Sequence, residues 1–186
     1  MTEKESYMAM LDKVSVALKQ TLYDLNEVVS IQTNLNLTVE PFNVKDYLED
    51  ILGLLKVEID KKEAKIINTV PDEMVVNFNA AYLESVLLNL LTNALRYSSP
   101  HRTPEIYISG AKIKDQWMLE IKDNGIGIDL VKNREKLFGL YKTFSNKTNS
   151  RGVGLFIAKN QVDAMNGKIE VESIPGEGSV FKIYFQ

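Results

Sequence analysis

The sequence has no cysteine and only one histidine, His101, among its 186 residues. The absence of cysteine excludes disulfides, thiolate metal sites and cysteine nucleophiles, and it agrees with a reducing compartment. No apolar run approaches the roughly 20 residues needed to cross a bilayer, and the polar start of the chain has no signal-peptide core behind it. We therefore expect a cytoplasmic segment that is not in the membrane, while a longer parent protein could still be membrane-anchored.

The sequence also lacks an excess of positive charge. Its 22 basic and 25 acidic side chains are mixed along the chain and leave a net charge of -3. No basic field is available to hold a polyanionic duplex, so nucleic acid is not an expected partner. With 45% hydrophobic residues, the chain has enough apolar content for one good-sized globular domain and a smaller appendage.

Apolar residues near the N-terminus follow the spacing of a helix that packs on another helix. They recur at alternating steps of three and four, interrupted only by Ser15, at Met8, Leu11, Leu18, Leu22, Leu25 and Val29. This seam can pack on a second copy, on the rest of the protein or on an upstream helix, and we favour a homodimer. An ordinary amphipathic helix docked on its own domain is the alternative. Residues 1–36 are predicted to form this helical domain and residues 37–186 a second one.

The second domain is predicted to alternate helices and strands. Residues 34–43 are polar and include Pro41, as in a linker or a short edge strand. Asn43 can cap the helix that follows. Helices are expected at 44–62, 80–97 and 152–165, and strands at 64–70, 75–78, 105–112, 116–122, 168–173 and 179–185. This order predicts an α+β two-layer sandwich in which helices cover one face of a mixed β-sheet.

The helix predicted at 80–97 carries polar residues suited to a phosphate-bound cation. Asn89 and Asn93 are four residues apart and therefore lie on one face, and amide oxygens are suitable ligands for Mg²⁺. One turn later, Arg96 can neutralise phosphate charge and Tyr97 can offer a ring and a hydroxyl. The alternative is that these residues form only the solvent-facing side of an amphipathic helix.

Two glycine clusters follow this helix in the sequence. Asp123 ends a predicted strand just before Gly125 and Gly127, where its carboxylate can accept a hydrogen bond from an exocyclic amine such as that of adenine. A plain Asx turn explains Asp123 equally well. Gly152 and Gly154 open a helix, where free N–H groups favour a phosphate, although a glycine pair alone is a weak signal.

Taken in order, these motifs resemble the N, G1, G2 and G3 boxes of histidine kinases, the last box corresponding to Gly176-x-Gly178-Ser179-x-Phe181. That family shares the Bergerat ATP-binding fold of gyrase, the Hsp90 chaperone and MutL. The resemblance runs from about Leu11 to Gln186. It implies ATP and Mg²⁺ as ligands, and it makes the first helix the second helix of a dimerisation and phosphotransfer hairpin.

The resemblance also assigns roles to residues. It makes Asn89 and Asn93 the magnesium-facing residues, Arg96 the basic phosphate contact that acts with them in catalysis, and Asp123 the carboxylate that reads adenine. The nucleotide-binding residues that it implies are Asn89, Asn93, Arg96, Tyr97, Asp123, Gly125, Ile126, Gly127, Tyr141, Lys142, Arg151, Gly152, Val153, Gly154, Leu155 and Ser179.

The segment between the glycine clusters resembles the F box and the mobile lid of these kinases. The F box corresponds to residues 137–142 and the lid to residues 143–151, whose polar composition predicts poor order without nucleotide. Many relatives carry Gly-Thr where this chain has Ser150-Arg151, and a basic residue where it has Thr143. The side chain that steadies the γ-phosphate is therefore left open among Lys142, Lys147 and Arg151.

The resemblance leaves three functions to weigh. Hydrolases of the wider superfamily carry a glutamate that acts as general base where this chain has Asn89. An amide is a poor base, so phosphoryl transfer to a histidine fits better. His101 is expected in a surface loop, so the acceptor histidine would lie upstream of this chain. We predict Mg-ATP binding without autophosphorylation. A response regulator receiver domain and an upstream sensory domain are the implied partners. The alternatives are an ATP hydrolase and a nucleotide-binding dimerisation scaffold.

Overall fold

The computed structural model describes residues 7–8, 10–11, 14–15, 38–140 and 152–186. The chain divides into two units, Met1–Asn36 and Leu37–Gln186. The described residues of the first unit are helical. Four positions of the predicted seam lie outside the described residues, namely Leu18, Leu22, Leu25 and Val29. Within the described part of the chain, no helix is long and apolar enough to cross a membrane.

The second unit is built on a five-stranded mixed sheet. The strands lie in the order β2 (Lys65–Thr69), β4 (Glu105–Ile113), β5 (Gln116–Asp123), β7 (Gly178–Tyr184) and β6 (Lys168–Ile174). β2 runs parallel to β4, and the other neighbouring pairs are antiparallel. Two further strands, β1 (Glu40–Asn43) and β3 (Val75–Phe78), form a separate antiparallel pair.

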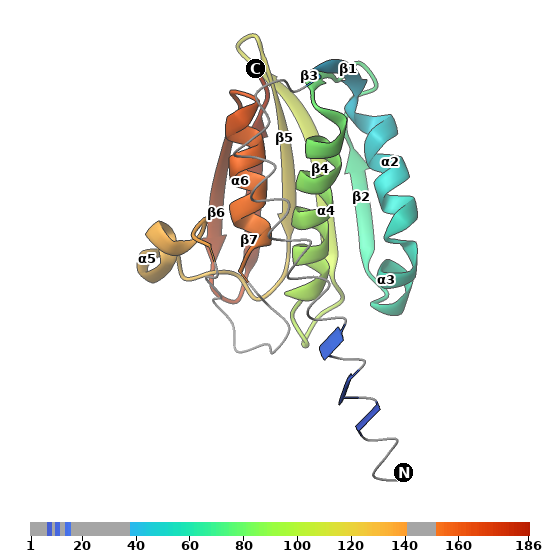
Figure 1. Ribbon diagram of the computed structural model, residues 1–186, viewed down its shortest axis with the longest axis vertical. Helices are drawn as coiled ribbons and strands as arrows, with labels where there is room; N and C mark the ends of the chain where they lie inside the picture. The colour runs from blue at the N-terminus through green and yellow to red at the C-terminus, as the bar shows by residue number, and fades with distance from the viewer. Residues whose placement is uncertain (1–6, 9, 12–13, 16–37, 141–151) are drawn as a thin grey trace. The chain divides into compact units, whose positions relative to one another are not determined.

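Helices cover one face of this sheet. Figure 1 shows α2 (Val44–Leu54), α4 (Ala80–Arg96) and α6 (Gly154–Ala164) side by side over it, with α4 in the middle. The remaining short helices are α3 (Lys56–Lys61), α5 (Leu130–Asn133) and the 3-10 turn η1 (Arg134–Lys136). The predicted two-layer α+β sandwich with a mixed sheet is confirmed.

The two faces of the sheet differ in chemistry, which explains why helices cover only one of them. Ile106, Ile108 and Ile121 on the inner face are at most 1% exposed and pack under the helices. Alternate residues on the other face form ion pairs in solvent, such as Lys65–Glu105 (3.2 Å) and Lys182–Glu172 (2.6 Å). Burial of one face and hydration of the other follow from the period of two along each strand.

α4 is the most deeply buried helix of this layer. It buries eight residues on its core face, Tyr82, Leu83, Val86, Leu87, Leu90, Leu91, Ala94 and Leu95. At roughly 1.5–3 kcal/mol for each fully buried large apolar side chain, this burial holds α4 firmly against the sheet. Polar side chains elsewhere on α4 therefore start from a fixed backbone.

The structure corrects two predicted helix boundaries and adds elements that were not expected. The helix predicted at 44–62 is two helices that meet at Leu55, because the backbone of Leu55 (φ -88°, ψ 0°) leaves the helical region; its side chain is buried, while Val57 is 78% exposed. The helix predicted from residue 152 begins at Gly154, because Gly152 has a left-handed φ of +67°. Neither α5 nor η1 was predicted, and the segment left open as linker or strand ends in β1.

Candidate functional site

α4 places Asn89 against the start of α6. The helix is capped by Asn79, whose side chain accepts a hydrogen bond from Tyr82 N (3.1 Å). Further along the helix, Asn89 donates to Ser85 Oγ at 3.4 Å, and its Oδ1 lies so near the Gly154 backbone that a Cβ there would be 2.5 Å away. A side-chain amide and the N-terminal end of α6 therefore lie side by side, which suits a phosphate together with its cation.

The C-terminal end of α4 is bonded to the first glycine cluster. Tyr97 caps the helix through its N–H to Asn93 O (2.9 Å), and its carbonyl accepts a hydrogen bond from Ile126 N (2.9 Å). Arg96, in the last turn, is exposed, and Asn93 is partly buried. The structure thus brings α4 into contact with both glycine clusters, as the sequence predicts for one site.

Asp123 ends β5 with its carboxyl group held by backbone amides. Gly125 N donates to Asp123 Oδ1 at 2.7 Å, and the Ser179 N–H also donates to this carboxyl. Burial raises the pKa of Asp123 above its ordinary 3.8, while the two amides and the charge of Arg102 act in the opposite direction without cancelling the rise. A partly buried carboxyl that keeps free lone pairs can accept a hydrogen bond from an amine.

Gly125 and Gly127 allow backbone segments to approach closely at this turn. A Cβ at Gly125 would lie 2.6 Å from Tyr97 O, and Gly127 has a φ of +69° that L-residues rarely adopt. Gly176 N donates to Ile126 O (2.7 Å), which joins the turn to the β6–β7 connection. Ser179, 6% exposed on β7, pairs with Asp123 of β5 beside this turn.

Sequence reasoning missed Arg102, which lies in the loop between α4 and β4. Its Nε donates to Asn124 O (2.6 Å), and its Nη2 donates to Gly125 O (2.7 Å), Gly176 O (2.6 Å) and Glu177 O (3.1 Å). No sequence signal could have revealed it, because all four acceptors are backbone carbonyls and Arg102 belongs to none of the glycine motifs.

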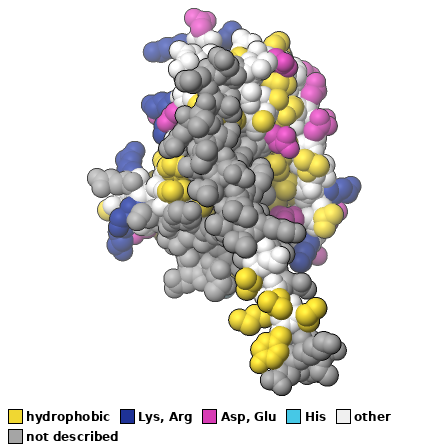
Figure 2. Space-filling view, in the orientation of Figure 1, with side chains coloured by type: hydrophobic (Ala, Val, Ile, Leu, Met, Phe, Trp, Pro, Cys, Tyr) yellow, Lys and Arg dark blue, Asp and Glu magenta, His cyan; other side chains and the backbone are white. Residues whose placement is uncertain are grey.

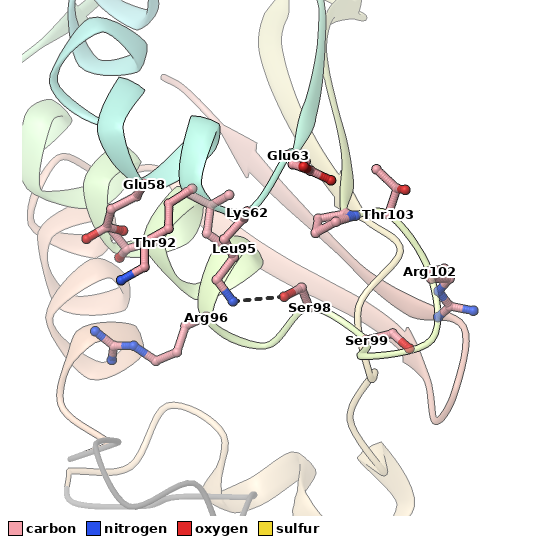
Figure 3. A pocket seen from close by; sticks show the side chains of 12 residues that line it. Glu58, Lys62, Glu63, Thr92, Leu95, Arg96, Ser98, Ser99, Arg102 and Thr103 are labelled. Atoms are coloured by element: carbon pink, nitrogen blue, oxygen red, sulfur yellow. Dashed lines mark hydrogen bonds between the residues drawn. The ribbon is translucent and has the colours of Figure 1, made fainter.

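A hollow of about 730 Å³ lies beside the C-terminal end of α4 (Figure 3). Arg96 and Arg102 lie at opposite ends of it, and Lys62 Nζ donates to Ser98 Oγ (3.1 Å) within it. Its lining comes from α3 and the residues just after it, from α4 and from the loop after α4: Glu58, Lys61, Lys62, Glu63, Thr92, Leu95, Arg96, Ser98, Ser99, Arg102, Thr103 and Pro104. Neither Asn89 nor Asp123 lines it, so it adjoins the predicted nucleotide site without coinciding with it.

Part of the predicted site falls in residues 141–151. Tyr141, Lys142, Arg151 and the lid, with Lys147, lie outside the described residues. Val153 is 4% exposed, and its carbonyl accepts a hydrogen bond from Ile157 N. Together with Gly152, Gly154 and Leu155 it forms the N-terminal end of α6. His101 is exposed in a loop, as predicted.

A metal ion at this site would depend on neutral ligands. Among the described residues, no group of three or more His, Asp or Glu side chains could hold a metal. The Asn89 and Asn93 amides supply neutral oxygens only, and such a set fits Mg²⁺ that arrives with phosphate oxygens as its charged ligands.

Comparison with known proteins identifies a family and several relatives that match most of the second unit. Residues 79–186 match the family described as "Histidine kinase-, DNA gyrase B-, and HSP90-like ATPase". A curated relative, Sensor protein TorS of Escherichia coli K12, is 30% identical over 164 residues, which cover 86% of this chain and 17% of TorS. The chain therefore spans less than a fifth of that relative's length.

Solved structures support the fold. The Acinetobacter baumannii histidine kinase AdeS matches with a TM-score of 0.79 at 24% identity, covering all of this chain and 86% of the AdeS chain. ShkA, solved at full length in complex with AMPPNP, matches with a TM-score of 0.81 at 20% identity, covering all of this chain and 39% of the ShkA chain. At these identities the likeness shows the fold alone.

Proposed function

Because the chain belongs to the family of histidine kinase-, DNA gyrase B- and HSP90-like ATPases, we propose that it is the ATP-binding catalytic part of a two-component sensor histidine kinase. It transfers the γ-phosphoryl group of ATP to a histidine upstream of this chain. The observation that carries the proposal is the packing of α4 against both glycine clusters, through Asn89 at Gly154 and Tyr97 at Ile126. The AMPPNP complex of ShkA agrees with a nucleotide site in this fold.

Each residue of the proposed site has a separate task. Asp123 accepts a hydrogen bond from the exocyclic amine of adenine, and the N-terminal end of α6 binds phosphate. Asn89 and Asn93 hold Mg²⁺, which supplies positive charge against the phosphates. Arg96 adds a charged donor at the phosphate end. Orientation and charge are most of what phosphoryl transfer to an already nucleophilic imidazole requires.

The proposed partners include a second copy of the chain. Met8, Met10 and Leu11 of the first unit are 57%, 65% and 64% exposed, and Figure 2 shows hydrophobic side chains gathered over these described residues. Such a surface on a helix favours association with another apolar helix, here a homodimer. A response regulator receiver domain as phosphate acceptor and a sensory domain in the full-length protein complete the proposal, by analogy with relatives named sensor proteins.

The proposal is tested by titrating fluorescent ATP into the purified chain with and without Mg²⁺. We expect saturable binding that is tighter with Mg²⁺, and we expect Asn93→Ala to remove the magnesium dependence. Asn77→Ala is the matched control, since Asn77 is an exposed asparagine on β3. Unchanged affinity and magnesium dependence in Asn93→Ala would instead favour a scaffold.

The same preparation distinguishes a kinase from a hydrolase. Asn89 occupies the position where a hydrolase needs a base, and its amide cannot accept a proton from water at neutral pH. We expect no steady release of phosphate from ATP when no acceptor is present. Continuous turnover under these conditions would contradict the kinase proposal.

A further inference from the structure

Arg102 joins two turns that are far apart in the sequence. Three of its four hydrogen bonds are no longer than 2.7 Å, and they reach Asn124 and Gly125 on one turn and Gly176 on the other. A guanidinium has a planar fork of donors and stays charged, so it can satisfy several carbonyls in a fixed geometry. The two turns therefore share one rigid cationic link.

One of the peptide groups that Arg102 binds also holds Asp123, and another lies next to the second amide that does. The carbonyl of Asn124 and the N–H of Gly125 belong to one peptide group: Arg102 donates to the carbonyl at 2.6 Å, and the N–H donates to Asp123 Oδ1 at 2.7 Å. On the other turn, Arg102 binds the carbonyls of Gly176 and Glu177, next to the Ser179 N–H that also reaches Asp123. A donor on the carbonyl polarises the peptide and strengthens its N–H as a donor.

We propose that Arg102 is a positioning residue for base recognition: it orients the backbone amides that aim the Asp123 carboxylate at the exocyclic amine, and so sets nucleotide affinity and the preference for adenine over guanine. The inference rests on the proposed function, since it assumes that Asp123 reads the base. Guanine carries a carbonyl where adenine carries the amine, so a carboxylate in a fixed position repels it.

Charge around Asp123 gives the proposal a second consequence. Among the described residues, Arg102 is the charged side chain that acts on this carboxyl, and it favours the ionised form. Of the nearby acids, Glu105 on β4 pairs with Lys65, and neither Glu105 nor Glu177 is among the groups that shift the pKa of Asp123. Lys122 precedes Asp123 on β5 and is exposed. It pairs with Tyr107 of β4, and its side chain lies on the face of the sheet opposite to that of Asp123. Loss of the Arg102 charge should therefore raise the pKa of Asp123, so that this carboxyl stays protonated up to a higher pH.

The test compares Arg102→Met, Arg102→Lys and Asp123→Asn with the unmodified chain, with Lys122→Met as the matched control for loss of a cation beside Asp123. Dissociation constants for ATP and GTP are measured between about pH 5 and 8, together with thermal unfolding of each variant. For Arg102→Met we expect ATP affinity about tenfold weaker, equivalent to one lost hydrogen bond of about 1.4 kcal/mol, and a smaller preference for ATP. As the pH is lowered, the affinity of this variant should begin to fall at a higher pH than that of the unmodified chain. Arg102→Lys retains the pH profile with part of the affinity, and Lys122→Met behaves as the unmodified chain.

Each other outcome counts against the inference in a distinguishable way. If Asp123→Asn weakens ATP binding but Arg102→Met does not alter affinity, preference or pH profile, the inference is wrong and the proposed function stands. If both Arg102 variants lower stability and affinity together while preference and pH profile stay unchanged, Arg102 has only a structural role. If Asp123→Asn leaves ATP binding unchanged, the assignment of Asp123 fails and the inference fails with it. Should Arg102→Met not fold, Arg102→Lys still decides through its partial affinity and its base preference.

Discussion

The Asp123 carboxyl illustrates a conflict between binding and stability at a single residue. Burial raises its pKa, so the folded chain holds the proton more tightly than the unfolded chain does. Ionisation therefore destabilises the folded state: the cost is absent below about pH 3.8, the ordinary value, and is complete above the raised pKa. A buried carboxylate that costs stability is typical of a residue retained for recognition.

We expect Asp123→Asn to change stability in a pH-dependent way. Relative to the unmodified chain, the variant should become more stable as the pH rises from 4 to 7, because the aspartate ionises at a cost in stability and the asparagine does not ionise. The free energy of unfolding of the variant should therefore increase relative to that of the unmodified chain. Urea unfolding at the two pH values measures this difference. A difference that does not vary with pH would show that Asp123 ionises equally in the folded and unfolded states.

Gly154 offers a test of the contact between α4 and α6. A Cβ at Gly154 would lie 2.5 Å from Asn89 Oδ1, so Gly154→Ala must displace the Asn89 amide. We expect Mg-ATP affinity to fall by about tenfold, a loss of about 1.4 kcal/mol, with little change in thermal stability because a side-chain end can move. Gly53→Ala is the control, because a Cβ there meets nothing within 4 Å. It should stabilise α2 by about 0.5–1 kcal/mol and leave binding unchanged.

At the scale of elements, the helices α2 and α4 are capped by asparagine at their N-terminal ends. The Asn43 side chain accepts hydrogen bonds from Lys45 N (2.9 Å) and Asp46 N (3.2 Å), and the same residue ends β1. One residue therefore ends the strand and begins the helix. The predicted capping role of Asn43 is confirmed, although the helix that it begins is shorter than predicted.

Replacing this cap gives an element-scale prediction. We expect Asn43→Ala to lower the free energy of unfolding by about 1 kcal/mol, the usual cost of losing a side-chain cap. Asn43→Ser should retain most of the stability, since serine caps helices as well as asparagine does. Equal losses in the two variants, measured by chemical denaturation, would assign the effect to the bond from Asn43 Nδ2 to Asp72 O instead.

At the scale of the whole molecule, the proposed function needs a histidine that this chain does not place at its nucleotide site. His101 is the single histidine and lies exposed in the loop after α4. The loop is tied down next to it by Arg102. A phosphoacceptor must come from another segment or another chain.

We expect the chain alone to bind Mg-ATP without becoming labelled by γ-radiolabelled ATP. Adding a separate helical hairpin that carries an acceptor histidine should transfer the label to that hairpin. Acid lability of the labelled product would identify phosphohistidine. Label on the chain itself that disappears in His101→Gln would contradict this prediction, and the same variant without effect is the expected control.

The sequence by itself determined the order of the main helices and strands, the glycine turns and the position of the helix that carries Asn89 and Asn93, because each depends on local period, caps and backbone freedom. It could not determine the break at Leu55, the pairing of β1 with β3 or the role of Arg102. Those depend on which distant segments meet, and Arg102 in particular binds carbonyls that every residue possesses. Only folding selects which of them come within its reach.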